Sequence, residues 1–176
     1  MTSSKFFSFS LFSLLLLSTT VLYVAEAEEP LPKTIVLYLQ DTVKGPNATV
    51  SPIIGLTGKD WSFDQFGTIF AVDDPIVLTP NPFSSAVGRA QGMLVVSARD
   101  GANVFVALSL VFTNFQYSGS SIQIQGVSRQ HEKFREVSVV SGTGKFRFVK
   151  GYAVFETAYY DANTAHSIIS LTVNFQ

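Results

Sequence analysis

After residue 27 the chain consists of short segments rich in valine, isoleucine, phenylalanine, tyrosine and threonine, separated by clusters of glycine, proline, asparagine, aspartate and serine. The first group of residues favours strands and the second favours turns, and signals for helices are scarce. The pattern therefore predicts an antiparallel all-β domain. The expected strands, each uncertain by about two to four residues at its ends, are 34–41, 67–73, 89–98, 104–115, 121–126, 135–140, 145–159 and 167–175.

One of these strands is apolar on both faces. Residues 104–112 read Val-Phe-Val-Ala-Leu-Ser-Leu-Val-Phe, whereas residues 121–125 read Ser-Ile-Gln-Ile-Gln and alternate between polar and apolar side chains. An alternating strand has one solvated face, but a continuously apolar strand needs both faces covered by side chains, a bound ligand or another subunit. A closed barrel within an oligomer would supply both covers.

The first 27 residues differ from the rest of the chain. Lys5 precedes a stretch from Phe6 to Val24 dominated by phenylalanine and leucine, and Ala25-Glu26-Ala27 places small residues where cleavage is determined. This order is typical of a secretory signal peptide. Serine and threonine interrupt the stretch and no basic cluster follows it, so a membrane anchor is the less favoured interpretation. We expect Met1–Ala27 to be removed and residues 28–176 to form the secreted domain.

The chain contains one acceptor sequence for N-glycosylation, Asn47-Ala48-Thr49, which a secreted protein would expose to the glycosylation machinery. It lies beside Gly45-Pro46, in what should be an exposed turn. Asn47 is therefore a predicted glycosylation site.

Composition excludes several classes of function. The 176-residue chain has 12 basic and 13 acidic residues and a formal net charge of −1, which gives no electrostatic reason to expect a nucleic-acid or anionic-membrane partner. The lack of cysteine excludes disulfides, thiolate catalysis and cysteine-type zinc sites, and two histidines leave few ligands for another metal centre. No Gly-x-Ser-x-Gly elbow occurs, which argues against a serine hydrolase. We expect neither a metal nor a cofactor.

The long segment Thr42–Gln65 is predicted to be a loop. It holds the chain's single tryptophan, Trp61, which is either a buried anchor of the loop or part of a lid that faces a ligand. Asp73-Asp74-Pro75 is predicted to be a turn, and Ser141-Gly142-Thr143-Gly144 a tight hairpin connection.

Two charged residues lie at the ends of otherwise apolar strands, Asp41 after Ile35–Gln40 and Arg135 before Val137–Val140. By period-two counting, Asp41 shares a face with Leu39. An apolar surrounding would raise the pKa of its carboxyl and suit it to proton transfer. A turn-initiating aspartate that accepts hydrogen bonds from backbone amides explains the same position equally well.

Five motifs follow one another over nearly the whole of residues 28–176. They are Leu37-Tyr38-Leu39-Gln40-Asp41, Phe66-Gly67-Thr68-Ile69-Phe70-Ala71-Val72-Asp73-Asp74-Pro75-Ile76, Val87-Gly88-Arg89-Ala90-Gln91-Gly92, Leu110-Val111-Phe112-Thr113-Asn114 and Arg135-Glu136-Val137-Ser138-Val139-Val140-Ser141-Gly142-Thr143-Gly144-Lys145-Phe146. In sequence and order these motifs resemble the dirigent protein family of plants.

The resemblance implies an eight-stranded antiparallel β-barrel, secreted to the extracellular space (the apoplast), that forms homo-oligomers, expected to be trimers. Each barrel would have one pocket. Dirigent proteins of this kind are non-redox auxiliary proteins: a separate oxidase, a laccase or peroxidase, makes phenoxy radicals of phenylpropanoid phenols. The pocket then orients these radicals so that their coupling to lignans or related phenolics gives one stereoisomer.

The resemblance also indicates site residues. Asp41 matches a pocket aspartate and Arg135 a pocket arginine of the lignan-forming members, so both are expected to take part in the chemistry. Other positions depart from those members: Gln40 replaces a histidine, Ser128 a second pocket aspartate, and Leu94 and Val96 two tyrosines, and the cysteine pair is absent. The pattern looks more like the divergent branch that includes pterocarpan-forming dehydratases. The expected lining of the pocket is Leu39, Leu94, Val96, Phe105, Ser128 and His166.

Three hypotheses follow. The leading one is stereo-direction of phenoxy radical coupling without any oxidation by the protein itself. The second is a cofactor-free lyase that dehydrates an isoflavanol or a similar alcohol through a quinone methide, with Asp41 in proton transfer. The third is a cell-wall or defence-related structural protein that binds no small molecule. A screen of phenolic substrates with and without an oxidase discriminates among them.

Overall fold

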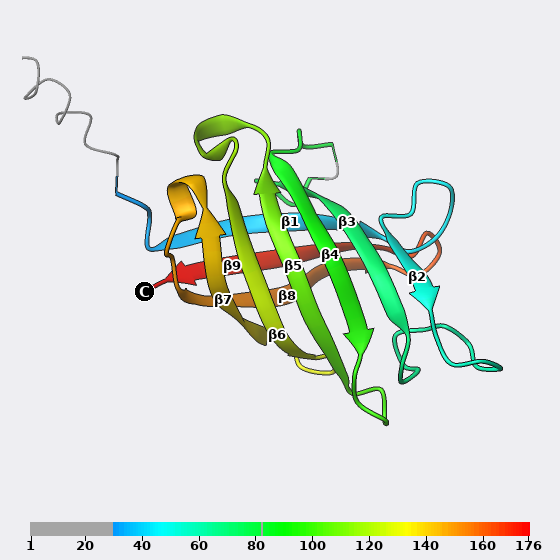
Figure 1. The fold of residues 1–176 in the computed structure, drawn as a ribbon. Coiled ribbons are helices and arrows are strands. Elements are labelled where there is room, and N and C mark those ends of the chain that lie inside the picture. The colour runs from blue at the N-terminus through cyan, green and yellow to red at the C-terminus, as the bar shows by residue number, and fades with distance from the viewer. Residues whose placement is uncertain (1–29, 82) are drawn as a thin grey trace, which may run out of the picture. The chain divides into compact units, whose positions relative to one another are not determined.

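The computed structural model describes residues 30–81 and 83–176, and the predicted leader, Met1–Ala27, lies outside the described residues. Residues Pro32–Gln176 form one compact unit built of strands (Figure 1). The described strands and the two short 3-10 helices are β1 (Thr34–Thr42), β2 (Val50–Ile54), β3 (Ile69–Val77), β4 (Gly88–Val96), β5 (Asn103–Phe112), η1 (Phe115–Tyr117), β6 (Ser121–Arg129), β7 (Arg135–Thr143), η2 (Gly144–Phe146), β8 (Gly151–Asp161) and β9 (His166–Phe175).

All paired strands are antiparallel and form one sheet in the order β1-β9-β8-β7-β6-β5-β4-β3-β2. The sheet closes because β1 also pairs with β3, with Tyr38 opposite Val77 and Leu39 opposite Ile76. β1 and β3–β9 therefore make the wall of an eight-stranded antiparallel barrel, which confirms the predicted fold. The short β2 pairs with the first half of β3 and extends that wall beyond the end of β1.

The barrel interior is filled by alternate side chains of each strand. In β5 every second residue from Val104 to Phe112 is buried, and the intervening residues are partly exposed. A fully buried valine, leucine or phenylalanine stabilises the folded state by about 1.5–3 kcal/mol. Since the chain has no cysteine, the folded state depends on this core and on the closed strand ladder rather than on disulfides.

An aromatic cluster fills the end of the barrel at which β5 and β9 finish. Phe112, Tyr117, Phe146 and Phe175 lie with ring centroids 4.8–5.7 Å apart. Phe146 at the centre of this cluster is fully buried. The opposite end, where β1 and β6 finish and β7 begins, is left for the pocket described below.

Four local predictions are wrong. Thr42–Gln65 is not entirely loop, because Val50–Ile54 forms β2. Ser141-Gly142-Thr143-Gly144 is not a hairpin connection, because β7 continues to Thr143 and only Gly144 lies beyond it. Residues 145–149 are not strand, because the chain reverses through η2 before β8 begins at Gly151. Asp73-Asp74-Pro75 is not a turn but part of β3. Pro75 is tolerated there because β3 has no paired residue on its β1/β2 side between Val72 and Ile76.

No helix long and apolar enough to cross a membrane occurs among residues 30–81 and 83–176.

Candidate functional site

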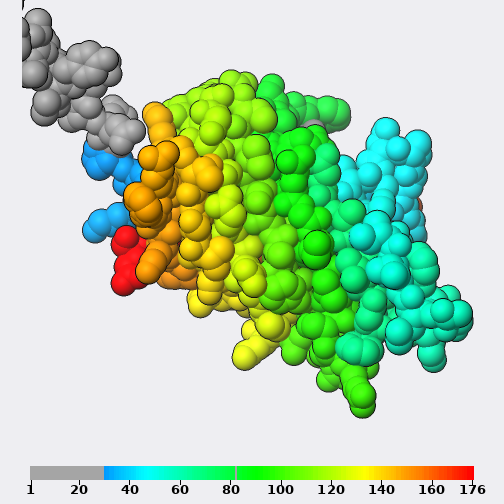
Figure 2. Space-filling model, in the orientation of Figure 1, coloured from blue at the N-terminus to red at the C-terminus, as the bar shows by residue number. Residues whose placement is uncertain are grey.

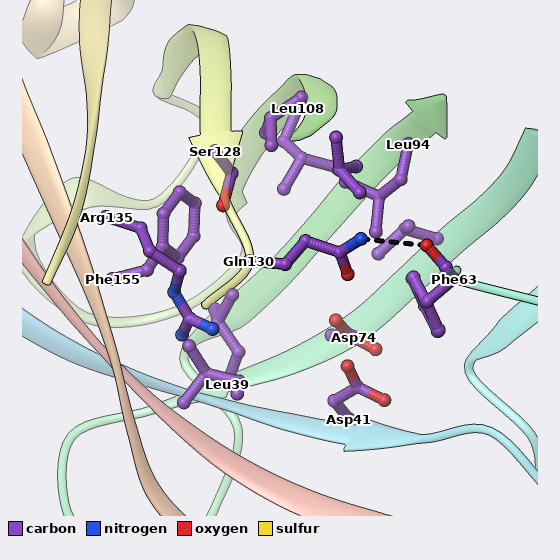
Figure 3. Close-up of a pocket in the computed structure, with 14 residues that line it drawn as sticks. Leu39, Asp41, Phe63, Asp74, Leu94, Leu108, Ser128, Gln130, Arg135 and Phe155 are labelled. Atoms are coloured by element: carbon purple, nitrogen blue, oxygen red, sulfur yellow. Dashed lines mark hydrogen bonds between the residues drawn. The ribbon is translucent and has the colours of Figure 1, made fainter. Parts of the chain in front are cut away.

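A cavity of about 140 Å³ opens at the end of the barrel where β1 and β6 finish. Its walls combine aliphatic and aromatic side chains with two carboxyls, one guanidinium, one amide and one hydroxyl (Figure 3). The lining residues are Leu39, Asp41, Phe63, Val72, Asp74, Leu94, Val104, Val106, Leu108, Ser128, Gln130, Arg135, Phe155 and Ile169.

The size of the cavity limits what it encloses. Engineered apolar protein cavities of about 150 Å³ bind a single benzene ring. The apolar walls, which include Leu94, Leu108 and Phe155, suit the faces of such a ring. The cavity is therefore large enough for one aromatic ring, and the rest of a larger ligand would extend through the mouth.

Two carboxyls meet on one side of the cavity (Figure 3). Asp41 is on β1 and Asp74 is on β3. Leu39 of β1 lies opposite Ile76 of β3, and two residues further along the same register Asp41 comes opposite Asp74. Both side chains face inward because they share the alternation of Leu39 and Ile76. Opposite residues of an antiparallel pair lie close enough for like charges to repel each other.

Burial and this repulsion raise both pKa values and separate the ionisation of the two carboxyls. Burial raises the pKa of Asp41 from 3.8 to about 6. Burial, and then the negative charge of Asp41, raise the pKa of Asp74 to about 8, although a hydrogen bond from Thr49 acts in the opposite direction. Asp41 ionises first, while Asp74 is still neutral, so its own pKa reflects burial alone. Near pH 7 the pair therefore holds one proton, and the higher pKa of Asp74 favours that residue as its carrier.

The two carboxyls differ in their hydrogen bonds. Thr49 Oγ1 donates to Asp74 Oδ1 at 2.6 Å. This contact leaves the other oxygen of Asp74 to carry the acid proton. Oδ1 of Asp41 is buried and makes no hydrogen bond with any described residue. A buried carboxylate oxygen without a partner is costly unless a ligand supplies a donor.

Arg135, the first residue of β7, brings a positive charge to the cavity (Figure 3). Its Nη2 donates to Thr157 Oγ1 at 3.0 Å, and its buried Nε finds no acceptor among residues 30–81 and 83–176. Burial lowers the pKa of its guanidinium, but arginine stays charged in proteins. Within that part of the chain Arg135 forms no salt bridge, so its charge is available for an oxygen atom of a ligand.

A loop between β2 and β3 covers part of the mouth. Phe63 stacks on Phe70 with ring centroids 4.0 Å apart and reaches the cavity. Gln130 Nε2 donates to the carbonyl oxygens of Phe63, at 2.8 Å, and Gly101, at 2.6 Å. Gly101 has φ +76°, and a Cβ there would lie 2.5 Å from the carbonyl oxygen of Asp64, so only glycine allows the 98–101 turn to approach the loop.

Trp61 does not line the cavity. Its indole lies against Gly55, where an added Cβ would be 2.5 Å from the ring, and 46% of the residue is exposed. Neither interpretation of Trp61 holds in full. The side chain contacts the loop without being buried, and the aromatic residue of this loop that lines the cavity is Phe63.

Five residues proposed from the sequence meet in the cavity. Leu39 and Leu94 contribute apolar wall, Ser128 a hydroxyl, and Asp41 and Arg135 the expected charges. What each of them does chemically remains a prediction.

Three other predicted lining residues lie elsewhere. Phe105 faces outward, because the inward set of β5 is Val104, Val106 and Leu108. Val96 has the inward orientation of Leu94 but is completely buried and does not line the cavity.

His166 is also excluded from the cavity. It pairs with Thr42, and its Nε2 lies 3.0 Å from Oε1 of Gln40, on the face of β1 opposite to Leu39 and Asp41. Because His166 is the first residue of β9, the sequence alone did not indicate whether its side chain faces the barrel interior or the outside.

Asp74, Gln130 and Phe63 line the cavity but were missed as site residues in the sequence. Asp74 had a usable signal, because Phe70, Val72, Asp74 and Ile76 alternate as one inward face once β3 is extended through the proline. Gln130 follows β6 and Phe63 lies in a loop, where no periodicity applies.

Among the described residues, no group of three or more histidine, cysteine, aspartate or glutamate side chains is arranged to hold a metal ion.

Fold and site together define a small closed β-barrel whose mouth leads to an apolar, ring-sized cavity with a carboxyl pair and an unpaired arginine. The sequence model of the dirigent-like protein family matches residues 32–176. Dirigent protein 23 of Arabidopsis thaliana is 35% identical over 136 residues, which cover 77% of this chain and 73% of that protein. The chain belongs to the dirigent family of plant proteins.

Two further relatives are pterocarpan synthases. Pterocarpan synthase 1 of Glycine max is 31% identical over 137 residues, which cover 77% of this chain and 74% of that enzyme. The solved structure of the pterocarpan synthase dirigent protein GePTS1 superposes with a TM-score of 0.74 and 28% identity, over 81% of this chain and 82% of that one.

Proposed function

We propose that the protein is a cofactor-free lyase that dehydrates a phenolic alcohol through a quinone methide and directs the ring closure that follows. The supporting observation is the pair of opposed carboxyls, Asp41 and Asp74, in an apolar cavity that also contains Arg135. One neutral and one ionised carboxyl at the same pH supply an acid and a base side by side. The similarity to pterocarpan synthases is in keeping with this chemistry.

In the first step Arg135 binds the phenol oxygen, which gives its proton to water at the mouth and becomes a phenolate. Asp74 then protonates the hydroxyl on the conjugated carbon. The carbon–oxygen bond breaks, water leaves, and the phenolate electron pair completes the quinone methide. Arg135 stabilises the charge on the phenolate oxygen, and Asp74 makes the hydroxyl a better leaving group.

In the second step another hydroxyl of the same substrate attacks the electrophilic carbon. Asp41 takes the proton of that hydroxyl, the new carbon–oxygen bond closes a ring, and the phenolate held by Arg135 regains a proton from water. The proton on Asp41 passes to Asp74, its neighbour across the strands. The net change is the loss of one water molecule, and both carboxyls return to their starting states.

A second candidate is the stereo-direction of phenoxy radical coupling, with radicals supplied by a separate oxidase. The observation in its favour is the rigid apolar wall of the cavity, which would hold one ring with a single face toward the mouth. The volume of about 140 Å³ encloses one ring, so the second radical would have to react from outside. The lyase needs only one substrate molecule, with one ring in the cavity and the rest at the mouth, so no second molecule has to be oriented outside.

The decisive experiment incubates the purified protein with a racemic isoflavanol that carries a second phenol hydroxyl, in the absence of any oxidase, and analyses the product by chiral chromatography. The lyase predicts an enantiomerically enriched, dehydrated product that Asp74→Asn reduces by at least 100-fold. Selective product only when an oxidase and a monolignol are added would support the second candidate instead. No saturable binding of any phenolic would support a structural wall protein and contradict both.

We further propose that the protein is secreted to the apoplast and glycosylated. Support comes from the leader-like Met1–Ala27 and from the exposed position of Asn47. Mass spectrometry of the protein secreted by plant cells tests both, through the mature N-terminus and the mass carried by Asn47.

We also propose a homo-oligomer, expected to be a trimer. The supporting observation is an apolar patch on the outward face of β4, β5 and β6. The outward row Val95–Phe105–Val127 crosses β4, β5 and β6, and Met93 lies beside it with 47% of its surface exposed. This face is turned toward the viewer in Figure 2. An uncharged apolar patch on a barrel wall is suited to a second copy of the chain. Analytical ultracentrifugation of the wild type and Val127→Lys tests this proposal, because a charge in the patch should dissociate the oligomer.

A further inference from the structure

Gln130 presents to the cavity a hydrogen-bond acceptor that no described residue occupies. Its side-chain amide donates both hydrogens of Nε2 to carbonyl oxygens, those of Phe63 and Gly101. Carbonyl oxygens only accept hydrogen bonds, so the amide nitrogen must be the atom that faces them. The remaining atom, Oε1, is therefore an acceptor, and it receives no hydrogen bond from the described residues. Figure 3 shows it directed toward the side of the cavity where Asp74 lies.

The position of this acceptor is rigid. The backbone N–H of Gln130 donates to the carbonyl oxygen of Ala102 at 3.0 Å, in addition to the two hydrogen bonds of the side chain. Three hydrogen bonds to the 101–102 turn and to Phe63 fix the residue at the mouth. A group held in this way binds a ligand without further loss of side-chain freedom.

From this geometry we propose that Gln130 is a specificity-determining residue that accepts a hydrogen bond from a hydroxyl group of the ligand. The inference rests on the proposed function and adds a requirement to it: the ligand is a phenol that carries a second hydroxyl with its hydrogen intact. Arg135 can only donate and Gln130 Oε1 can only accept. A ring with one oxygen at Arg135 and a hydroxyl at Gln130 is thus oriented in one direction, and an ether or a carbonyl at the second position is rejected.

The test uses pairs of one-ring probes that differ only by a hydroxyl in place of a methyl group: catechol and ortho-cresol, resorcinol and meta-cresol, hydroquinone and para-cresol. Dissociation constants are measured by titration calorimetry. In the wild type we expect the dihydroxy member of at least one pair to bind about tenfold more tightly than its cresol. In Gln130→Leu we expect this preference to disappear.

The ratio of the two dissociation constants within a pair distinguishes recognition of the hydroxyl by Gln130 from a structural effect of the mutation. Gln130→Leu also releases the loop that contains Phe63, and a loosened loop would weaken both members of a pair equally. Emission of Trp61, the single tryptophan, reports the loop independently. Gln116→Leu, an exposed site in η1 at the other end of the barrel, makes the same substitution away from the cavity and should keep the preference.

Three results are distinguishable. Loss of the preference in Gln130→Leu supports the inference. A preference that survives in Gln130→Leu, or that Ser128→Ala removes instead, overturns it, as does saturable binding of cresols with no preference in any pair. Absence of saturable binding for every probe contradicts the proposed function itself.

Discussion

Thr49 Oγ1, immediately before β2, donates a hydrogen bond of 2.6 Å to Oδ1 of Asp74 in β3. The same oxygen accepts the backbone N–H of Thr42 at 2.9 Å, so the hydroxyl hydrogen is oriented toward the carboxyl. Thr49 is also the third residue of the sequence Asn47-Ala48-Thr49. Thr49 is thus both the third residue of the predicted glycosylation sequence and the hydrogen-bond donor to Asp74 in the cavity. Mutation can separate these two roles.

Removal of this hydroxyl should move the pH dependence of activity. The hydrogen bond from Thr49 lowers the pKa of Asp74, so Thr49→Val should raise it further. If Asp74 must be protonated, the alkaline midpoint of the kcat/KM profile should rise by about one pH unit, since a hydrogen bond to a charged group contributes about 1.5–3 kcal/mol. Asn47→Gln is the matched control, because it removes the glycosylation sequence and keeps the hydroxyl. An equal shift in Asn47→Gln would assign the effect to the glycan.

The wild-type pH profile should be bell-shaped. Activity requires Asp41 ionised and Asp74 protonated, so kcat/KM should be greatest between pH values of about 6 and about 8. Because the two groups interact, the two midpoints belong to the pair. Initial rates measured from pH 4 to pH 10 on the isoflavanol substrate provide the check. A rate that rises steadily to pH 10 would be incompatible with an acid on Asp74.

Stability should fall as the pH rises. Both carboxyls have a pKa in the folded state above the ordinary 3.8, so the folded chain keeps protons that the unfolded chain releases. Their stabilising contribution is complete below pH 4 and is lost as the pH passes through about 6 and about 8. Asp74→Asn should therefore unfold with a free energy about 4–6 kcal/mol greater than wild type at pH 9, and nearly equal to it at pH 4.

Asp73→Asn is the control for this comparison. Asp73 is the neighbour of Asp74 in β3, but it is exposed, and the hydrogen bond from Arg89 lowers its pKa. Its removal should change stability by less than about 1 kcal/mol, because exposed ion pairs contribute little. Urea denaturation at the two pH values gives both comparisons. An Asp74→Asn variant no more stable than wild type at pH 9 would mean that Asp74 is not a buried acid.

The charge of Arg135 should matter far more than that of a nearby surface cation. Arg135→Met should reduce kcat/KM by about 100-fold or more, as loss of a donor to a developing oxyanion does in other enzymes. Lys133→Met removes a cation that is 72% exposed and pairs with Glu156 at 3.3 Å, and should change kcat/KM by less than about threefold. Equal losses in the two variants, with both still folded by circular dichroism, would refute a specific role for Arg135.

Most of the barrel was predictable, because its strands are long and regularly patterned. The apolar run in β5 predicted a cover on both faces; the barrel interior covers the inward set, the outward set is partly exposed, and its cover by a second subunit stays a prediction. The same run concealed the orientation of Phe105. Both alternating sets are largely apolar, and the one polar residue of the run, Ser109 in the outward set, is a weak signal for which set faces inward. The same ambiguity does not affect β6, where Ile122 and Ile124 alternate with polar residues and are buried.

The site was predictable only in part. Asp41 and Arg135 stand out because each interrupts an apolar pattern, and both reach the cavity. Asp74 was hidden by the residues around it, since Asp-Asp-Pro is typical of a turn and only the pairing of β3 with β1 and β4 keeps it extended. The replacement of an expected aspartate by Ser128 therefore does not leave the cavity with a single carboxyl.

The most direct test is a titration of the two carboxyls by nuclear magnetic resonance, in protein with carbon-13 at the aspartate side chains. Asp41→Asn and Asp74→Asn identify the two signals, and Asp73 provides a reference that titrates below its ordinary range. We predict that the Asp41 carboxyl titrates near pH 6 and the Asp74 carboxyl near pH 8, so that at pH 7 one is ionised and the other neutral. Titration of both carboxyls near pH 4 would contradict the acid–base pair and the lyase chemistry built on it.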